Sequence, residues 1–522
     1  MSAEFDAVVV GSGPNGLAAA VTLTAAGLRV LVIEGDATVG GGCRTEQLTL
    51  PGFWHDVCAA AHPLAVTSPF FRRLGLAGRG VELAGSRVVF AQPLDGGRAA
   101  VVTRSVPETA ARLGADGPAY RRLFEPLARD CLPLTDLLLS PIRRPPGRVS
   151  RGVAGFAANG LRSAAGIARR WHGPEARALF AGAAAHGMLP LTRPPSGAVG
   201  LMLTALAHAA GWPVAVGGSA RITAALADAV VAGGGRIETG RWVRSLAELP
   251  PARAVLLDVT PRALLTLAAG RLPGGYAAGL RRFRYGAGVC KVDFALAGPV
   301  PWRNPDCREA GTLHLGGRWD EIAAAETDVA AGRHPERPYV LVTQPGVADP
   351  TRAPGEQQTL WAYCHVPAGS DVDMTARIET QIERFAPGFR DLVLARHTMT
   401  AAQEEARNPN YVGGDIAAGL QTIWQTVARP VPRWNPYRTP LPGVYLCSSS
   451  TPPLPGVHGR CGELAALSAL RDVFGLRQPP DLGALPATPP QASPAAPAPE
   501  TSLAPHLPAA PAAPGHPTRS TR

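Results

Sequence analysis

This 522-residue sequence has no closely spaced pair of cysteines and only one lysine. The eight cysteines include no CxxC pair, which excludes the usual spacing of a zinc site, a disulfide framework or a dithiol reductase. We therefore expect no metal site and reduced thiols, mostly in the core. Lys291 is the single lysine, so arginine supplies nearly all of the positive charge.

The net charge of +11 has two interpretations. It would suit an acidic membrane surface or nucleic acid. The joint abundance of Ala, Gly, Pro and Arg instead indicates the coding bias of a GC-rich genome. No basic stripe interleaved with aromatic residues is present, so we expect no nucleic-acid partner.

The sequence also lacks a basic N-terminal segment and a long unbroken apolar run. Its first residues lead directly into apolar sequence, which is not the pattern of a secretory signal. The apolar stretch 198–216 contains His208, Gly211 and Pro213, whereas a membrane span needs roughly 20 apolar residues. We expect it to form a buried helix and loop, or the wall of an apolar pocket. These features predict a cytoplasmic protein, with peripheral membrane contact and a homodimer both left open.

The composition that is present supports a folded chain of two or more domains. Hydrophobic residues make up 46% and charged residues 17%, enough for a sizeable core. Apolar runs predict strands at 7–10, 28–33, 236–246, 254–259, 285–298, 338–366 and 441–446, and helices at 14–26, 217–231 and 463–473. From residue 478 the chain is rich in Pro and Ala, so we predict a disordered tail over 478–522.

The strongest motif is a dinucleotide fingerprint between the first strand and the first helix. Gly11 permits a tight turn, Gly13 lets the backbone approach a pyrophosphate, and Gly16 lets the helix pack close to the strand. The helix N-terminus then offers its amides to the phosphates. Glu34 ends the second strand and can accept hydrogen bonds from a ribose diol, while its charge disfavours NADP.

A second glycine cluster, Gly40-Gly41-Gly42, decides between FAD and NAD. Bare backbone there can also run close to a diphosphate, and Arg44 can add a charge-assisted contact. A plain NAD dehydrogenase does not need this second clamp, so we predict FAD. An ordinary glycine loop with a surface arginine is the alternative interpretation. The residues expected to bind the cofactor in these two loops are Gly11, Gly13, Pro14, Asn15, Gly16, Glu34, Gly41, Gly42 and Arg44.

These motifs resemble those of the glutathione-reductase-type FAD flavoproteins of the amine oxidase and phytoene desaturase superfamily. Later stretches narrow the resemblance to the phytoene-desaturase-like group that includes pyridine nucleotide-disulfide oxidoreductase domain-containing protein 2. Those stretches are residues 282–294, 299–302, 385–389, 408–415 and 445–459. The "disulfide" part of that name has no support in the residues, because a redox-active cysteine pair is missing.

The resemblance implies an α/β fold with a Rossmann FAD-binding domain assembled from separated segments and an inserted α+β substrate domain. We place the FAD-binding segments at 1–105, 214–284 and 430–477, and the substrate domain at 106–213 and 285–429. It also implies that Val243 contacts the adenine side and that the loop with Thr451, Gly456 and Val457 lines the isoalloxazine. The family has a run of glycines where this chain has Leu454-Pro455, so the turn there is expected to differ.

A flavin performs the difficult chemical step itself by accepting hydride at N5, so no elaborate catalytic triad is expected. Lys291 lies in an apolar strand, and the resemblance implies that it holds a water over N5; an edge lysine pointing to solvent is the alternative. His458 could stabilise anionic reduced flavin or could be an ordinary loop histidine. His365, His55, Asp56 and His62 are weaker candidates.

Two functions of different class follow. The first is an FAD-dependent dehydrogenase, desaturase or oxidase acting on a small hydrophobic, isoprenoid-like substrate, with an electron acceptor that the sequence does not identify. The second is a weakly catalytic or non-catalytic FAD-binding regulator or interaction protein, favoured by the Leu454-Pro455 departure.

Overall fold

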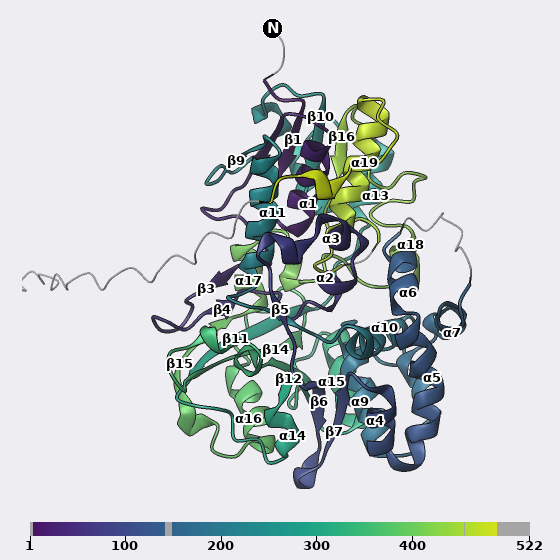
Figure 1. The fold of residues 1–522 in the computed structure, drawn as a ribbon, viewed down its shortest axis with the longest axis vertical. Coiled ribbons are helices and arrows are strands. Elements are labelled where there is room, and N and C mark those ends of the chain that lie inside the picture. Colours follow the sequence, from purple (N-terminus) through teal and green to yellow (C-terminus); the bar gives the residue numbers. More distant parts are fainter. Residues whose placement is uncertain (1–3, 141–148, 454, 488–522) are drawn as a thin grey trace, which may run out of the picture. The chain divides into compact units, whose positions relative to one another are not determined.

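The computed structural model describes residues 4–140, 149–453 and 455–487. A five-stranded sheet is fully parallel, in the order β16-β10-β1-β2-β9. Its strands are β16 (Val444–Leu446), β10 (Ala254–Leu257), β1 (Ala7–Val10), β2 (Val30–Ile33) and β9 (Arg236–Glu238). Strands that are distant in sequence thus meet in one sheet, as the predicted assembly from separated segments requires (Figure 1).

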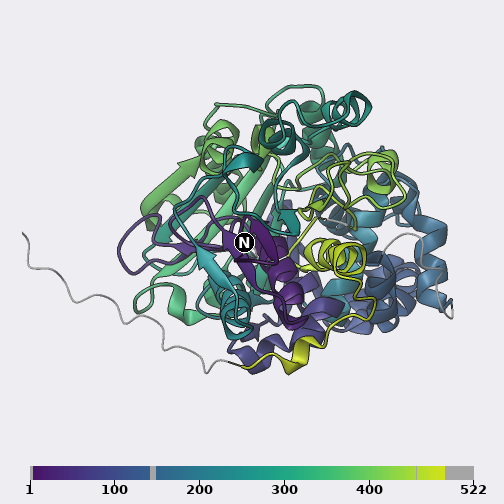
Figure 2. The ribbon, with the colours of Figure 1, turned by 90° about the horizontal axis from the view of Figure 1, so that it is seen from above.

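Helices cover both faces of this sheet, which explains its unbroken apolar strands. Successive residues of β1 point to opposite faces of the sheet. Val9 packs against one group of helices, and Val8 packs against the other. The first group is α1 (Pro14–Ala25), α11 (Ala220–Ala232) and α19 (Arg460–Val473). The second is α12 (Pro261–Leu267) and α13 (Gly274–Arg281). Figure 2 shows the purple α1 beside the yellow α19, the helices of the two ends of the described chain.

A second sheet has seven strands in the order β15-β11-β14-β13-β12-β6-β7. They are β15 (Val393–Met399), β11 (Gly288–Leu296), β14 (Gln358–Val366), β13 (Val340–Thr343), β12 (Ala310–Leu315), β6 (Val88–Pro93) and β7 (Ala99–Thr103). One face packs on α9 (Pro174–Ala185), α10 (Ser196–Ala209) and α15 (Trp319–Ala330); the other packs on α16 (Thr375–Phe385). The stretch expected to be a buried helix and loop forms α10. A loop with the buried Trp212 follows the helix and leads into the short strand β8 (Val214–Ala215).

Three expectations about these elements were wrong. Residues 88–103 were grouped with the FAD-binding segments, but β6 pairs in parallel with β12 and so belongs to the second sheet. The strand expected over 236–246 ends at Glu238, because the chain turns at Gly240, whose φ is +69°. Disorder was expected in the tail from residue 478, but Leu482 and Leu485 are buried against the core of the five-stranded sheet. The remainder of that tail, from residue 488, lies outside the described residues.

In the described ranges no helix has the length and apolar character needed to cross a membrane. The short strands β3 (Thr45–Glu46) and β4 (His55–Asp56) form a hairpin that follows the second glycine cluster.

Candidate active site

The loop between β1 and α1 begins the candidate site. Gly11 has a φ of +95°, which glycine adopts without steric cost. A Cβ atom on Gly16 would lie 2.1 Å from the carbonyl oxygen of Gly11, so only glycine lets the helix start this close to the strand. The helix begins at Pro14 with no side-chain cap from Gly13. Pro14 has no N–H, so the amides that follow it are the ones offered to a phosphate.

Glu34 is held at the carboxyl edge of the parallel sheet. Its Oε2 accepts hydrogen bonds from the backbone N–H of Ser12 (2.8 Å) and from the Ser12 hydroxyl (2.5 Å). Its Oε1 accepts a third from the backbone N–H of Asp36 (2.9 Å). The carboxylate is therefore fixed beside the glycine loop, where a ribose diol would lie in a Rossmann domain.

The second glycine cluster lies against the first. Gly41 has a φ of +53°, and a Cβ there would lie 3.0 Å from the Cα of Gly13, so the two loops meet backbone to backbone. The buried Arg44 guanidinium pairs with Asp36 (Nη1 to Oδ2, 2.7 Å) and donates to the carbonyl oxygen of Thr38 (2.8 Å).

One cavity of about 610 Å³ joins these elements, a volume within the usual range for ligand sites. Eleven of the residues expected to bind the cofactor line it. They are Gly11, Gly13, Pro14, Asn15, Glu34, Gly41, Gly42, Arg44, Val243, Gly456 and Val457. Gly16 packs behind the lining, and Val243 lies in the loop after β9 instead of in a strand.

The lining fits a dinucleotide. Glycine backbone forms part of its walls, at positions where a side chain would fill the space. Asn15 Oδ1 and Arg44 Nε are buried without a hydrogen-bond partner among the described residues, and both side chains line the cavity. Buried polar atoms are nearly always satisfied, so a ligand or water that supplies their partners is expected here. FAD brings the phosphates and ribose hydroxyls that such groups bind.

Sequence reasoning missed Asp258, the half-buried residue that follows β10 and lines the cavity. Its Oδ2 accepts a hydrogen bond from the backbone N–H of Gly16 (2.9 Å). A polar residue directly after an apolar parallel strand is the signal that could have identified it, because ligands bind outside the carboxyl ends of such strands.

The C-terminal loop is only partly in the cavity. Gly456, with a φ of +130°, and Val457 line it, whereas the buried Thr451 and His458 do not. The His458 Nδ1 accepts a hydrogen bond from the backbone N–H of Arg460 (3.0 Å), so this nitrogen carries no proton and the ring helps to start α19. The role of His458 beside a flavin stays a prediction. Leu454 lies outside the described residues.

Lys291 is buried, with 2% of its surface exposed, so an edge lysine pointing to solvent is excluded. Its ammonium pairs with Asp293 on the same strand face and lies 5.7 Å from the ring centroid of Trp361. His55 Nδ1 is 3.7 Å from the other Asp293 oxygen, and His397 Nδ1 is 3.9 Å from Oδ2. Burial alone would raise the pKa of Asp293, but Lys291 and these histidines lower it. Burial lowers the pKa of His55 to about 4, so this ring is neutral.

Glu404 on α17 (Ala401–Arg407) connects this cluster to the cavity. Burial raises its pKa to about 7 despite the opposing effect of Lys291, and its Oε2 lacks a hydrogen-bond partner among the described residues. Burial, together with a lesser effect of the charge of Glu404, raises the pKa of Cys58 to about 12. The charge of Lys291 opposes this rise and lowers the pKa by less. Because Cys58 lines the cavity, the buried cluster lies beside its wall.

The weaker histidine candidates have structural partners. His365 Nδ1 lies 2.7 Å from Glu326 Oε1, and His62 Nε2 lies 2.7 Å from the Ser219 hydroxyl. Asp56 pairs with the guanidinium of the buried Arg352 (3.0 Å). It also accepts hydrogen bonds from the Thr45 hydroxyl and from the backbone N–H of Ser219, both at 2.7 Å. None of these side chains lines the cavity.

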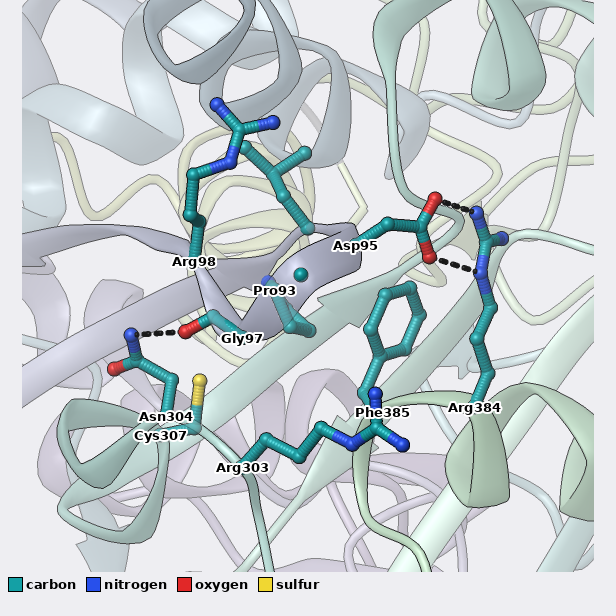
Figure 3. Close-up of a pocket in the computed structure, with 11 residues that line it drawn as sticks. Pro93, Asp95, Gly97, Arg98, Arg303, Asn304, Cys307, Arg384 and Phe385 are labelled. Atoms are coloured by element: carbon teal, nitrogen blue, oxygen red, sulfur yellow. Dashed lines mark hydrogen bonds and ion pairs between the residues drawn. The ribbon is translucent and has the colours of Figure 1, made fainter.

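A second pocket, shown in Figure 3, is too small to compete with this site. It encloses about 10 Å³ between the turn that joins β6 to β7, the segment 303–307 and the end of α16. Asp95 and Arg384 close one side through two hydrogen bonds of 2.7 and 2.5 Å. The volume holds at most one water molecule.

Comparison with known proteins agrees with the fold. Residues 9–74 match the model of the NAD(P)-binding Rossmann-like domain family. The chain is 25% identical to rat (Rattus norvegicus) pyridine nucleotide-disulfide oxidoreductase domain-containing protein 2, over 90% of this chain and 94% of that protein. This match confirms the resemblance inferred from the sequence.

Solved structures show the same architecture. An oxidoreductase from Methanosarcina mazei superposes with a TM-score of 0.59 at 18% identity, covering 89% of this chain and 99% of that chain. Putrescine oxidase bound to putrescine superposes with a TM-score of 0.56 at 20% identity, covering 90% and 99%. At this identity the likeness establishes the fold alone, a mixed α/β fold with a Rossmann-like domain.

Proposed function

We propose that the chain binds FAD in the 610 Å³ cavity and acts as an FAD-dependent oxidoreductase that takes hydride from a hydrophobic substrate. One observation carries this proposal: two bare glycine loops, residues 11–16 and 40–42, meet Glu34 around one cavity at the carboxyl edge of a parallel sheet. The matching family model is named for NAD(P), but the second loop is a clamp that a plain NAD dehydrogenase does not need. Relatives and structural neighbours named as oxidoreductases support the reaction class.

The chain's own residues divide the binding task. Glu34 binds the adenosine ribose, and the amides at the start of α1 bind the diphosphate. Val243 and the half-exposed Trp242 line the cavity, and we assign the adenine to them. The lining contributed by Ala59, Ile416, Ala418 and Val457 is apolar, which favours a hydrophobic substrate beside the ring.

When bound, the flavin accepts hydride at N5. Lys291 does not itself line the cavity, so it acts from behind the wall at Cys58, where it positions a water toward this ring while Asp293 holds its ammonium in place. Removal of a hydride from a C–H bond leaves a cation, which becomes a double bond when the neighbouring carbon or nitrogen loses a proton. Glu404, whose pKa is about 7, is the acceptor in this cluster that is poised to change its protonation near neutral pH.

Anaerobic reduction tests this function. The purified protein, saturated with FAD, is mixed with dithionite and, in separate runs, with putrescine, cyclohexylamine or an isoprenoid polyene in detergent micelles. We expect dithionite and at least one substrate to bleach the flavin, and Lys291→Met/Asp293→Asn to slow substrate reduction by about 10-fold or more. A bound flavin that dithionite reduces and no substrate reduces would favour an FAD-binding regulator instead.

A further inference from the structure

Asp258 places a carboxyl group against all three glycines of the fingerprint. A Cβ on Gly13 would lie 2.8 Å from Asp258 Oδ2, and one on Gly16 would lie 3.0 Å from it. A Cβ on Gly11 would lie 3.1 Å from the Asp258 Cβ. The backbone N–H of Gly16, one of the amides that a helix N-terminus offers to phosphate, donates to this carboxyl group (2.9 Å).

The charges around Asp258 do not neutralise a carboxylate there. Among the described residues Asp258 makes no ion pair, although five arginines line the same cavity. Four of those arginines pair with other carboxylates: Arg44 with Asp36 (2.7 Å), Arg241 with Glu238 (2.8 Å), Arg262 with Glu405 (2.5 Å) and Arg407 with Glu46 (2.5 Å). The fifth, Arg244, lies with Val243 in the loop after β9.

The remaining titratable neighbours make the site more acidic or leave it neutral. Glu34 and Asp36 come from the end of β2, and Cys447 follows β16. Burial raises the pKa of Cys447, so this thiol is neutral, and burial likewise raises the pKa of Tyr411. An ionised Asp258 would thus add a negative charge beside the doubly negative diphosphate of FAD without an ion pair of its own, which is unfavourable at this half-buried position.

We propose that Asp258 binds the FAD diphosphate as the neutral carboxylic acid, donating a hydrogen bond to it, so that FAD binding at alkaline pH takes up one proton. This inference rests on the proposed FAD function. The protonation of Asp258 needs no further reactant, since the proton comes from solvent and stays on the Asp258 carboxyl group.

The electrostatics agree with this assignment. Burial raises the pKa of Asp258 to about 7, the Gly16 N–H lowers it in part, and Glu34 raises it further. Asp258 is half-buried and lines the cavity. A bound nucleotide displaces water from the cavity and adds negative charge, and both effects raise the pKa of a carboxyl group. The protonated form is therefore favoured more strongly in the complex than in the free protein.

The consequence for affinity has a definite sign. If only protonated Asp258 binds FAD, affinity is constant below pH 7 and weakens by about 10-fold per pH unit above it. The opposing interpretation is that Asp258 stays ionised and serves only as a cap for α1, which would leave affinity independent of pH over this range.

The test measures the Kd of flavin-depleted protein for FAD from pH 5.5 to 8.5 by quenching of flavin fluorescence. Asp258→Asn keeps an oxygen that accepts from Gly16 but carries no charge, and Asp36→Asn is the matched control because it removes another carboxylate of the same cavity. We expect the wild type and Asp36→Asn to weaken at least ~10-fold between pH 7 and 8.5, and Asp258→Asn to stay flat and to bind more tightly at pH 8.5.

A second readout is calorimetry at pH 8 in two buffers of different ionisation enthalpy. The wild type should take up close to one proton per FAD and Asp258→Asn none. Parallel Kd profiles for the wild type and Asp258→Asn, without proton uptake, would overturn this inference while leaving FAD binding intact. Failure of every variant to bind FAD at any pH would instead refute the proposed function.

Discussion

The buried Lys291–Asp293 pair is the most consequential contact at the scale of single residues. Two charges withdrawn from water stabilise a fold only while they remain paired. The pair lies on the face of β11 that is turned toward Trp361 and the histidines, so neither charge can recover its hydration by a small movement. A single substitution therefore leaves an uncompensated charge inside the protein.

We expect Lys291→Met to lower the free energy of unfolding by about 3–5 kcal/mol, because Asp293 is then buried alone. The double variant Lys291→Met/Asp293→Asn should recover most of that loss. Urea unfolding followed by circular dichroism measures both. Equal destabilisation of the single and double variants would show that the pair is not coupled.

Glu404 gives a second prediction, in which pH is the variable. Its pKa is raised from 4.5 to about 7 in the fold, so between these values the unfolded chain ionises and the folded chain does not. Stability contributed by this group is thus present below about pH 4.5 and is lost as pH rises to 7. Relative to the wild type, Glu404→Gln should gain about 3 kcal/mol from pH 4.5 to 7.5 in urea unfolding. A difference that does not change with pH would contradict this account.

At the scale of elements, the junction of β1 and α1 depends on contacts between backbone atoms. Gly16→Ala introduces a Cβ that would lie 2.1 Å from the Gly11 carbonyl oxygen, so the helix must move away from the strand. We expect a loss of about 1–3 kcal/mol in stability and a fall of at least ~10-fold in FAD affinity. Gly78→Ala is the control, because nothing lies within 4 Å of its added Cβ. Retained affinity in Gly16→Ala would show that this close approach is not needed.

The sequence predicted the elements whose signals are local. The βαβ unit with Gly11, Gly16 and Glu34 was readable because strand, turn and helix follow one another directly. Asp258 and Glu404 were missed because their importance comes from neighbours far away in the chain, Gly16 for one and Lys291 for the other. The grouping of β6 failed for the same reason, since its partner β12 lies more than two hundred residues later.

At the scale of the whole molecule, the C-terminal segment closes the core of the five-stranded sheet. Leu482 and Leu485 are 2% and 8% exposed and belong to the cluster that contains α1 and α11. The double variant Leu482→Ala/Leu485→Ala should lower stability by about 3 kcal/mol or more. Leu476→Ala, at an exposed position (43%), should change it by less than about 0.5 kcal/mol. Thermal unfolding of the full chain compares them, and equal melting temperatures would show that the segment adds nothing.

The flavin content of the purified chain is the most direct test of FAD binding by the two glycine loops. After saturation with FAD and removal of the excess by gel filtration, absorbance of the released flavin against protein concentration gives the stoichiometry. We expect one FAD per chain, and much less in Gly16→Ala, whose first helix must shift. A colourless protein that retains no FAD, or equal retention by both proteins, would contradict this expectation.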